Sequence, residues 1–543
     1  MEHTEQTSTK VQIRLPLILA ATLAVGMLIG QLLPHYDQQF SLSGSYKAGG
    51  GSLDEILRFV SSKYVDTVNT NDLRDEAIDH LLSKLDPHSI YISPDELKAV
   101  EDDMNGGFEG VGIEFILVDD TMQVVTPLTG GPAEAAGILA GDKIVSINDT
   151  AIAGNKTDNG LIYKKLRGEK GTSVKIGVLR GAETALRNFN IVRAIIPVHS
   201  VDIAYMLDDR TGYLKINRFT NQTYQEFMGA LRPLAEDKGM QNLVIDLRGN
   251  PGGYLEEATE ILSQIFPDTK LLVYTKGRTE QRKDYKSNGR ARFNIQQVAV
   301  LIDEGTASAS EIMAGAVQDW DRGWVIGRRS YGKGLVQEQY PLSDGGALRL
   351  TIARYYTPSG RCIQRDYKHD TDYAHDGERR LKHGELSDAS KVILPDSTKY
   401  YTGFGRVVYG GGGITPDVFI PYDTVLSGEY CQLLRQNLTQ FVTRWMESQD
   451  RKAMPADLQE FTRNWSASDA MLDSLADYTD NQGAKRDATQ FIHCRNEFKT
   501  LLKARVAKIL FGDLGRYTVE NDDDPAVEKA LQLLSAGIQV TKK

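Results

Sequence analysis

The chain contains 543 residues, enough for about two to four domains, and its 41% hydrophobic and 25% charged content is ordinary for a globular protein. Its net charge of −10 argues against a nucleic-acid-binding protein, which would present a basic face to phosphates. The three cysteines, Cys362, Cys431 and Cys494, are widely spaced and indicate neither a disulfide framework nor a zinc site. We expect three unpaired thiols, with a single disulfide as the alternative.

The first 34 residues predict a cytoplasmic tail and a membrane anchor. Residues 15–33 are almost entirely apolar and near the length that crosses a bilayer. Lys10 and Arg14 precede this segment and no further Lys or Arg occurs before Lys47, so the positive-inside rule places residues 1–14 in the cytoplasm. We therefore expect a single-pass protein of the cytoplasmic membrane whose remaining residues face the periplasm. A cleaved signal peptide is the alternative, although no A-x-A site follows the apolar run.

The segments that follow differ in pattern. Residues 35–52 are polar and rich in Gly and Ser, which predicts a flexible linker. Residues 53–104 carry apolar side chains at helical spacing, and residues 105–195 read as short strands and turns with one or two helices, which predicts a helical part and then a small β-rich domain. In residues 196–425 buried strands alternate with glycine loops and helices, which favours an α/β core with a parallel sheet. Residues 426–543 are predicted to be α-helical and carry no chemical motif.

The fold class predicted from these segments is α/β multidomain. Within the core, the stretch 365–400 is polar and irregular, and we expect it to be an exposed insertion. Three roles are open for the C-terminal helices: covering the core, forming an oligomer contact or binding a partner.

Ser308, in the stretch GTASAS, is the first candidate for chemistry. It follows a predicted buried strand and lies where a helix begins. Backbone N–H groups at a helix start favour developing negative charge, and the small neighbours Gly305, Ala307 and Ala309 leave room for a substrate backbone. These are the needs of an acyl-transfer nucleophile. The alternative is that Ser308 only caps the helix.

Lys333, in the stretch YGKGLVQ, is the candidate base. Burial would lower its pKa and make the neutral amine available, and Gln337 could hold that amine by a hydrogen bond. The alternative for Lys333 is a surface lysine in a glycine turn, and the alternative for Gln337 is a solvated strand residue. No G-x-S-x-G or H-E-x-x-H motif is present, and no S-x-x-K occurs together with S-D-N and K-T-G partners. Histidines such as His88 and His199 lie outside any motif, so we expect them to be structural or exposed, although spacing does not exclude a Ser–His pair.

Two glycine loops could bind negative charge. Gly252 and Gly253 follow the strand VIDLR, and loops at the carboxyl ends of adjacent parallel strands meet at one site. An N–H group of either glycine, with that of Ala309, is therefore a candidate oxyanion hole. The loop in GVGIEF could cradle a C-terminal carboxylate while a peptide adds along the strand that follows. Ordinary glycine turns are the alternative for both loops.

Taken together, DLRGNPGG, GTASASE, YGKGLVQ and ARYYTPSGRCIQ resemble the hallmark segments of the C-terminal processing peptidases, the tail-specific serine proteases of the S41 type. The stretch from GVGIEF to GDKIVSIND resembles the PDZ domain inserted in these proteins. The resemblance covers roughly residues 53–420 and implies an α/β core of the crotonase-like (ClpP-like) kind. The insertion at 365–400 and the residues after 426 lie outside the part that can be matched.

The resemblance implies a serine endopeptidase that cuts proteins near their C-termini. Ser308, rather than Ser310, would be the nucleophile, Lys333 the general base and Gln337 the residue that orients it. Gly252 or Gly253 would form the oxyanion hole with Ala309. The PDZ domain would bind the substrate tail and gate the active site, with a carboxylate-binding loop made of Gly110, Val111, Gly112 and Ile113.

No metal or organic cofactor is implied. The expected partners are proteins or peptides with exposed C-terminal tails, the membrane, and a second copy of the chain or an adaptor, but no nucleic acid. The main alternative is a catalytically inactive PDZ scaffold that holds C-termini. A transport or lipid-binding scaffold and an enzyme that is inactive until PDZ gating releases it are the other hypotheses.

Overall fold

A computed structural model describes residues 51–537, apart from 119, 129, 140, 155–158, 182, 184, 369–372, 394–395, 397 and 451–452. Within the described residues no helix is both long and apolar enough to cross a membrane, and the anchor predicted at residues 15–33 lies outside them. The chain divides into two units, Met1–Glu76 and Ala77–Lys543. The described part of the first unit consists of α2 (Ser52–Lys63), which has no buried residue, and the start of α3 (Thr70–Ser83).

The second unit holds a β-rich domain that is inserted through a two-stranded neck. Strand β2 (Gly107–Gly110) leads into the domain and pairs antiparallel with β9 (Ala194–Pro197), which leads out of it. The sheet order is β3-β4-β5-β7-β8, with β6 paired to β5, and the buried residues form a separate apolar core. The elements of this domain are β3 (Ile113–Val118), β4 (Thr121–Pro127), α5 (Pro132–Ala135), β5 (Lys143–Ile147), β6 (Thr150–Ala151), α6 (Asn159–Leu166), β7 (Ser173–Leu179) and β8 (Arg187–Val192).

The α/β core is built on a six-stranded sheet of order β10-β11-β12-β15-β16-β21. The β10–β11 pair is antiparallel. The other four strand pairs are parallel, as the alternation of strands, glycine loops and helices predicted. All five residues of β12 are buried, because a central parallel strand is covered on both faces, and its three middle residues, 243–245, are apolar. The strands are β10 (Val201–Met206), β11 (Thr211–Ile216), β12 (Asn242–Asp246), β15 (Gln297–Ile302), β16 (Trp324–Gly327) and β21 (Val418–Phe419).

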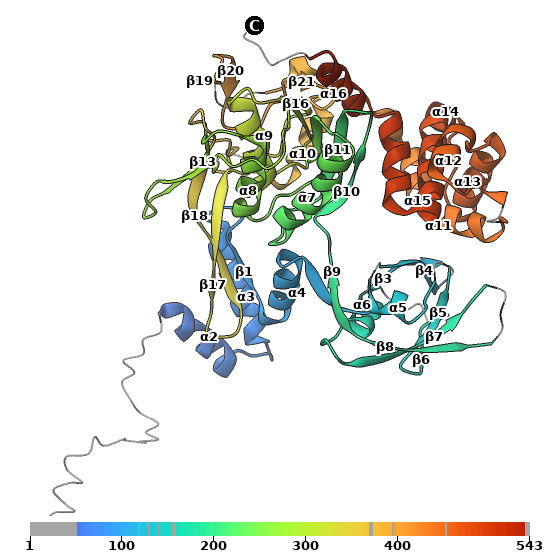
Figure 1. Cartoon of the computed structure of the whole chain (residues 1–543). Helices are drawn as coiled ribbons and strands as arrows, with labels where there is room; N and C mark the ends of the chain where they lie inside the picture. Colours follow the sequence, from blue (N-terminus) through green and yellow to red (C-terminus); the bar gives the residue numbers. More distant parts are fainter. Residues whose placement is uncertain are drawn as a thin grey trace, which may run out of the picture. The chain divides into compact units, whose positions relative to one another are not determined.

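The two faces of this sheet are covered by helices from different parts of the chain (Figure 1). One face packs against α7 (Thr223–Arg232), which runs on into the π-turn Pro233–Asp237, and against α8 (Leu255–Ile265) and α9 (Ala309–Asp319). The other face packs against α16 (Pro525–Ser535) at the C-terminal end of the chain. Of the three roles left open for the C-terminal helices, α16 therefore fills the first, covering the core.

A second sheet of five strands carries the segment after Lys333. Strand β17 (Leu335–Pro341) pairs antiparallel with β18 (Ala347–Tyr356), and the order β1-β18-β13-β14 completes the sheet. Strand β1 (Ile90–Ile92) lies in the part predicted to be entirely helical; three residues are too few to show a strand pattern, and only pairing with β18 defines them. The remaining elements of this region are α4 (Pro94–Met104), β13 (Leu271–Gly277) and β14 (Lys283–Lys286).

The stretch 365–400 is not simply an exposed insertion, contrary to the prediction. It contains the 3-10 turns Tyr373–His375 and Ala389–Lys391 and the helix α10 (Asp376–Lys382). Arg380 and Glu385 are buried, and Glu385 pairs with Arg380 at 2.8 Å and with Arg329 at 2.7 Å. The segment looked polar in sequence because it buries paired charges rather than apolar side chains. A hairpin of β19 (Lys399–Tyr401) and β20 (Val407–Tyr409) follows it.

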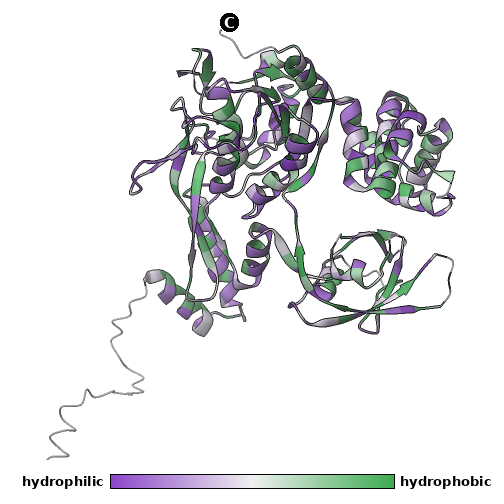
Figure 2. Cartoon of the chain, in the orientation of Figure 1, coloured by the Kyte–Doolittle hydropathy of each residue, from purple (hydrophilic) through white to green (hydrophobic). Residues whose placement is uncertain are grey.

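Residues 425–522 form a helical bundle with its own apolar core. Figure 2 shows hydrophilic and hydrophobic residues interleaved along its helices, as amphipathic helices require. A disulfide joins Cys431 to Cys494, so the expectation of three unpaired thiols was wrong, and only Cys362 is free. The bundle consists of the 3-10 turn Val425–Ser427, α11 (Glu429–Glu447), α12 (Leu458–Asn464), α13 (Asp469–Asn481), α14 (Ala488–His493) and α15 (Arg495–Asp522).

Loss of the disulfide should destabilise this bundle. The bridge spans 63 residues, so restricting the unfolded chain stabilises the fold by about 4 kcal/mol at most in the chain-entropy model. Cys431→Ser should therefore unfold at clearly lower urea concentration than the wild type under oxidising conditions, and reductant should abolish the difference. Cys362→Ser is the matched control, because it removes the unpaired thiol. Equal midpoints for Cys431→Ser and the wild type without reductant would show that the bridge contributes nothing.

Candidate active site

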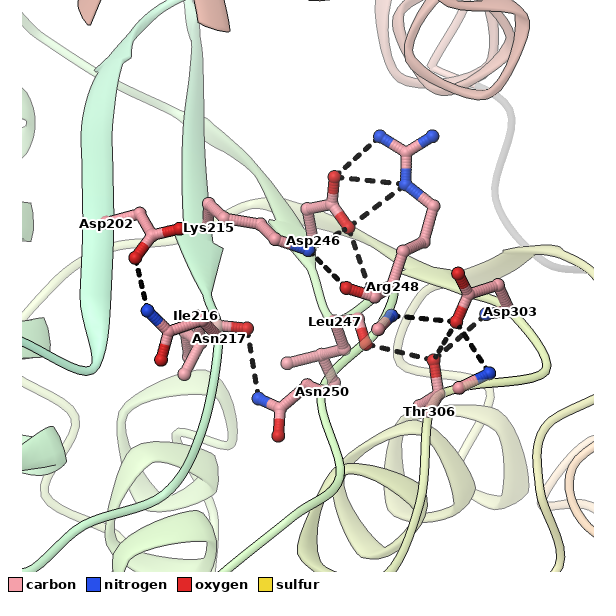
Figure 3. Close-up of polar contacts among 12 residues, drawn as sticks. Asp202, Lys215, Ile216, Asn217, Asp246, Leu247, Arg248, Asn250, Asp303 and Thr306 are labelled. Carbon is pink, nitrogen blue, oxygen red and sulfur yellow. Dashed lines mark hydrogen bonds and ion pairs between the residues drawn. The ribbon is translucent and has the colours of Figure 1, made fainter. Parts of the chain in front are cut away.

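Two loops at the carboxyl ends of neighbouring strands are locked together. One follows β12 and the other follows β15, which pairs parallel to it. The N–H of Gly249 donates to Oδ1 of Asp303 at 2.8 Å, and the N–H of Ala307 donates to the carbonyl of Asn250 at 2.9 Å. Figure 3 shows Asp303 and Thr306 beside the loop that contains Leu247 to Asn250. The loops meet at one site, as the parallel sheet predicts.

Ser308 stands at the end of the second loop in an unusual backbone conformation. Its φ of 55° and ψ of −117° are costly for a non-glycine residue and persist only where the surroundings enforce them. Ser308 is half-buried and lines a cavity of about 780 Å³. Ser310 is completely buried, and its hydroxyl donates to the carbonyl of Asn250 at 3.2 Å. Of the two serines, only Ser308 lines the cavity.

The predicted oxyanion-hole residues lie next to Ser308. Gly252 has a φ of +97°, and a Cβ added there would lie 2.7 Å from Cβ of Ser308 and 2.9 Å from the nitrogen of Ala309. The N–H of Gly252 already donates to Oδ1 of Asn250 at 2.8 Å. Gly253 packs against Phe219, whose N–H donates to the carbonyl of Gly252. Because N–H and C=O of a trans peptide point in opposite directions, the N–H of Gly253 points away from Phe219.

Lys333 and Gln337 are in direct contact. The amine Nζ of Lys333 donates to Oε1 of Gln337 at 3.0 Å, and Nε2 of Gln337 donates to the carbonyl of His88, which sets the orientation of the amide. Burial lowers the pKa of Lys333, and the Arg349 guanidinium lowers it further. Glu311 and Asp86 act in the opposite direction on the same amine. The site therefore favours the neutral amine more than water does.

Glu311 was not recognised in the sequence as part of the site. Its buried carboxylate accepts hydrogen bonds from the N–H groups of Ser308, Gly332 and Lys333 at 2.7–2.9 Å and from the hydroxyl of Ser330 at 2.5 Å. Burial raises the pKa of Glu311 to about 7, and these four donors oppose a further rise. One side chain thus joins the backbone of the candidate nucleophile to that of the candidate base. The spacing S-x-x-E, typical of a helix capping box, is the signal that could have found it.

Tyr355 makes a second bridge between the same two segments. Its buried hydroxyl lies 2.6 Å from the carbonyl oxygen of Lys333 and 3.1 Å from that of Ser308. Nothing in the sequence distinguishes this tyrosine from its neighbours on β18. Glu311 and Tyr355 together tie the helix start that carries Ser308 to the loop that carries Lys333.

Tyr355→Phe should lower kcat by about tenfold with a smaller change in KM, because it removes a buried hydroxyl that donates a hydrogen bond to the carbonyl of Lys333. Steady-state cleavage of one peptide by the purified variant and wild type checks this. Tyr356→Phe, on the next residue of β18, is the matched control. An unchanged kcat in Tyr355→Phe would show that Glu311 alone suffices to hold the two segments.

The predicted catalytic residues, which come from both sheets and their loops, line the same cavity. Among the described residues that line it there is no histidine. Burial lowers the pKa of His88 to about 4, and its ring is hydrogen-bonded to Tyr373 at 3.0 Å. His88 thus contributes its backbone carbonyl, to Gln337, rather than a base. The predicted site residues that line the cavity are Gly252, Gly253, Ser308, Ala309, Lys333 and Gln337.

The predicted carboxylate loop lies in the inserted domain. Gly110 ends β2, Ile113 begins β3, and Gly112 between them has a φ of +75°. Val111 is buried in the domain core. The carbonyls of Val111 and Gly112 accept hydrogen bonds from Ala133 and Leu128 at 3.0 Å, so the N–H groups of Gly112 and Ile113 point away from these partners.

Known protein families match two segments of the chain. Residues 210–373 match peptidase family S41, and residues 110–191 match the PDZ domain family. A carboxy-terminal-processing protease of Bartonella bacilliformis is 37% identical over 322 residues, which cover 57% of this chain and 71% of that protein. The chain belongs to the carboxy-terminal-processing proteases of peptidase family S41.

A second relative, one solved structure and one further family model are also similar to parts of the chain. The carboxy-terminal processing protease CtpB of Bacillus subtilis is 35% identical over 316 residues, which cover 58% of this chain and 65% of that protein, slightly less than two thirds. The solved photosystem II D1 C-terminal processing protease is 27% identical, and the match covers 70% of this chain and 90% of that chain with a TM-score of 0.34. Residues 430–512, in the helical bundle, match a family of unknown function (DUF8443).

Proposed function

We propose that this S41 protein is a serine endopeptidase that cleaves protein substrates near their C-termini, with Ser308 as nucleophile and Lys333 as general base. The observation that carries the proposal is the shared cavity: Ser308 and the half-buried Lys333 both line it, and Glu311 and Tyr355 hold their backbones together. Family membership supports the same reaction class.

The proposed reaction begins when the neutral amine of Lys333 takes the proton of the Ser308 hydroxyl. Oγ of Ser308 then attacks the substrate carbonyl, and the N–H groups of Ala309 and Gly253 stabilise the oxyanion. We favour Gly253 over Gly252 because the N–H of Gly252 is already bonded to Asn250. Lys333 returns the proton to the leaving amine, and the acyl-enzyme is hydrolysed by a water that Lys333 deprotonates.

The inserted domain would select substrates by their C-termini. The proposed contact is a tail carboxylate held by the N–H groups of Gly112 and Ile113, with the tail added as a strand along β3. The outward direction of these N–H groups and the match to the PDZ family support this role.

The test uses the full-length protein in detergent and a substrate protein with a flexible apolar C-terminal tail, followed by mass spectrometry. We expect fragments cut near the tail with the wild type and none with Ser308→Ala. A substrate that ends in a C-terminal amide should be cut more slowly, because it lacks the carboxylate. Tail binding without cleavage by the wild type would instead favour a scaffold that only holds C-termini.

We further propose that residues 15–33 anchor the protein in the cytoplasmic membrane, with the catalytic part in the periplasm. The disulfide between Cys431 and Cys494 supports an oxidising compartment, since such bonds are rare in the cytosol. Protease added to intact spheroplasts should degrade the catalytic part. Its full protection until the cells are lysed would contradict this placement.

A further inference from the structure

The C-terminal end of the chain forms one face of the catalytic core. Helix α16 contacts β12, β15 and β16 of the core sheet. Val527, Ala530 and Leu534 of this helix are buried against Val244 and Leu301 of the sheet. The segment that matches the family of unknown function ends at residue 512, before this helix. Tyr517, near the end of α15, and the apolar face of α16 therefore pack against the protease core.

Polar contacts join the same segment to the strand ends. The hydroxyl of Tyr517 donates to Oδ2 of Asp202 at 2.7 Å, and the amide of Asn521 donates to the hydroxyl of Tyr205 at 2.9 Å. The guanidinium of Arg248 bonds Oδ2 of Asp524 at 2.6 Å through Nη1. This last contact differs from the others because Arg248 begins the loop that leads to Gly252 and Gly253.

Arg248 is part of a small buried network around Asp246 (Figure 3). Its Nη2 donates to Oδ2 of Asp246 at 2.6 Å, and the amine of Lys215 donates to Asp246 and to the carbonyl of Arg248. The side chain of Asp246 is 2% exposed, and the Arg248 and Lys215 cations hold its pKa well below the usual range against the effect of burial. With Asp524 the network contains two carboxylates and two cations, so its charges balance.

The carboxylate of Asp524 serves two elements at once. Its Oδ1 accepts hydrogen bonds from the N–H groups of Ala526 and Val527 at 2.8 and 3.2 Å, which caps the start of α16. Its Oδ2 pairs with Arg248. The side chain of Asp524 is 17% exposed and that of Arg248 is 24% exposed, so water screens the pair only in part.

We propose that Asp524 is a positioning residue for the active site: through Arg248 it holds the loop of Gly252 and Gly253 in place for the oxyanion. The inference rests on the proposed peptidase function. Without the Asp524 charge the network has one excess cation, and the Arg248 side chain keeps Asp246 of β12 but loses its contact with the C-terminal segment. The loop then samples other positions, which weakens binding of the transition state more than binding of the substrate.

The test compares Asp524→Asn with Val527→Ala in the full-length protein. Asparagine caps a helix as well as aspartate does, so Asp524→Asn removes the ion pair and keeps the cap. Val527→Ala weakens the packing of α16 and keeps the ion pair. We expect Asp524→Asn to lower kcat by about tenfold, the loss of one charge-assisted hydrogen bond, with KM nearly unchanged. Its affinity for a tetrahedral peptide boronate should fall by the same factor, while Val527→Ala keeps both values.

A separate comparison of variants tests whether Asp524 acts through Arg248. If Asp524 acts through Arg248, the double variant Arg248→Lys with Asp524→Asn should be no slower than Arg248→Lys alone. Wild-type kcat and boronate affinity in Asp524→Asn would overturn the inference. The inference would also be overturned if the losses of kcat in Asp524→Asn and Val527→Ala were in proportion to the decreases of their urea midpoints. A purely structural role of Asp524 predicts that proportionality. If the wild type cleaves nothing, the peptidase proposal itself fails, and the inference fails with it.

Discussion

Lys333→Ala should lower kcat by about 10⁴-fold, since it removes the only base proposed for Ser308, and the effect of a residue acting in a unit with the nucleophile is of this order. KM should change little, because Lys333 acts on the hydroxyl of Ser308 rather than on the substrate. Single-turnover cleavage of the tail-bearing protein, quantified by mass spectrometry, measures a loss of this size. Gln337→Ala is the graded control: it keeps the base and removes its 3.0 Å contact, so we expect a loss of about tenfold.

The pH profile of the wild type gives a second measurement of the same base. Lys333 accepts the proton only when its amine is neutral, so kcat should rise with pH through the pKa of Lys333 in the complex. Burial lowers that pKa, so the rising limb should lie below the usual lysine range. A rate that falls with pH over this interval would contradict a lysine base, and residual activity of Lys333→Ala within tenfold of the wild type would contradict it more directly.

Glu311→Ala should have the second largest effect, with a loss in kcat of at least about 10²-fold and a lower free energy of unfolding by about 3 kcal/mol. The substitution leaves four donors without their acceptor, among them the N–H groups of Ser308 and Lys333. The nucleophile and the base then lose their common support. Kinetics and urea unfolding of the same preparation separate the two effects.

Two further variants test whether the effect of Glu311→Ala comes from the loss of the carboxylate. Glu311→Gln keeps the size of the side chain but turns an N–H₂ group toward donors, so it should lose most of the activity while remaining folded. Ser310→Ala is the control on the same helix: it removes one hydrogen bond to Asn250 and should stay close to wild type. Near-wild-type kcat in folded Glu311→Ala would show that the carboxylate does not support the site.

The local order of elements around the site was predictable from the sequence. Strands β12 and β15 contain apolar runs, residues 243–245 and 298–302, each followed by a loop with small residues and a helix, and this pattern specifies parallel strands whose loops share one edge. The contact of Lys333 with Gln337 joins residues close in sequence, so their spacing was enough to expect it. The catalytic roles of these residues stay predictions until the variants are measured.

Other features depend on contacts between distant parts of the chain, and only the tertiary structure decided them. Tyr355 and Glu311 are ordinary residues of a strand and a helix until folding places them between Ser308 and Lys333. The disulfide pairs cysteines that are 63 residues apart, and the polar stretch 365–400 becomes buried because its charges find partners such as Arg329.

The C-terminal helix is the clearest case. Its amphipathic pattern specified a helix with one apolar face but not the surface that this face covers. Any exposed apolar face of the core could accept such a helix, because the hydrophobic effect has no direction. The sequence by itself therefore determined most of the elements, the order of the loops and the candidate nucleophile and base. Folding decided that the last helix closes the core sheet and that Asp524 meets Arg248, because both depend on which surfaces are left uncovered when the sheet forms.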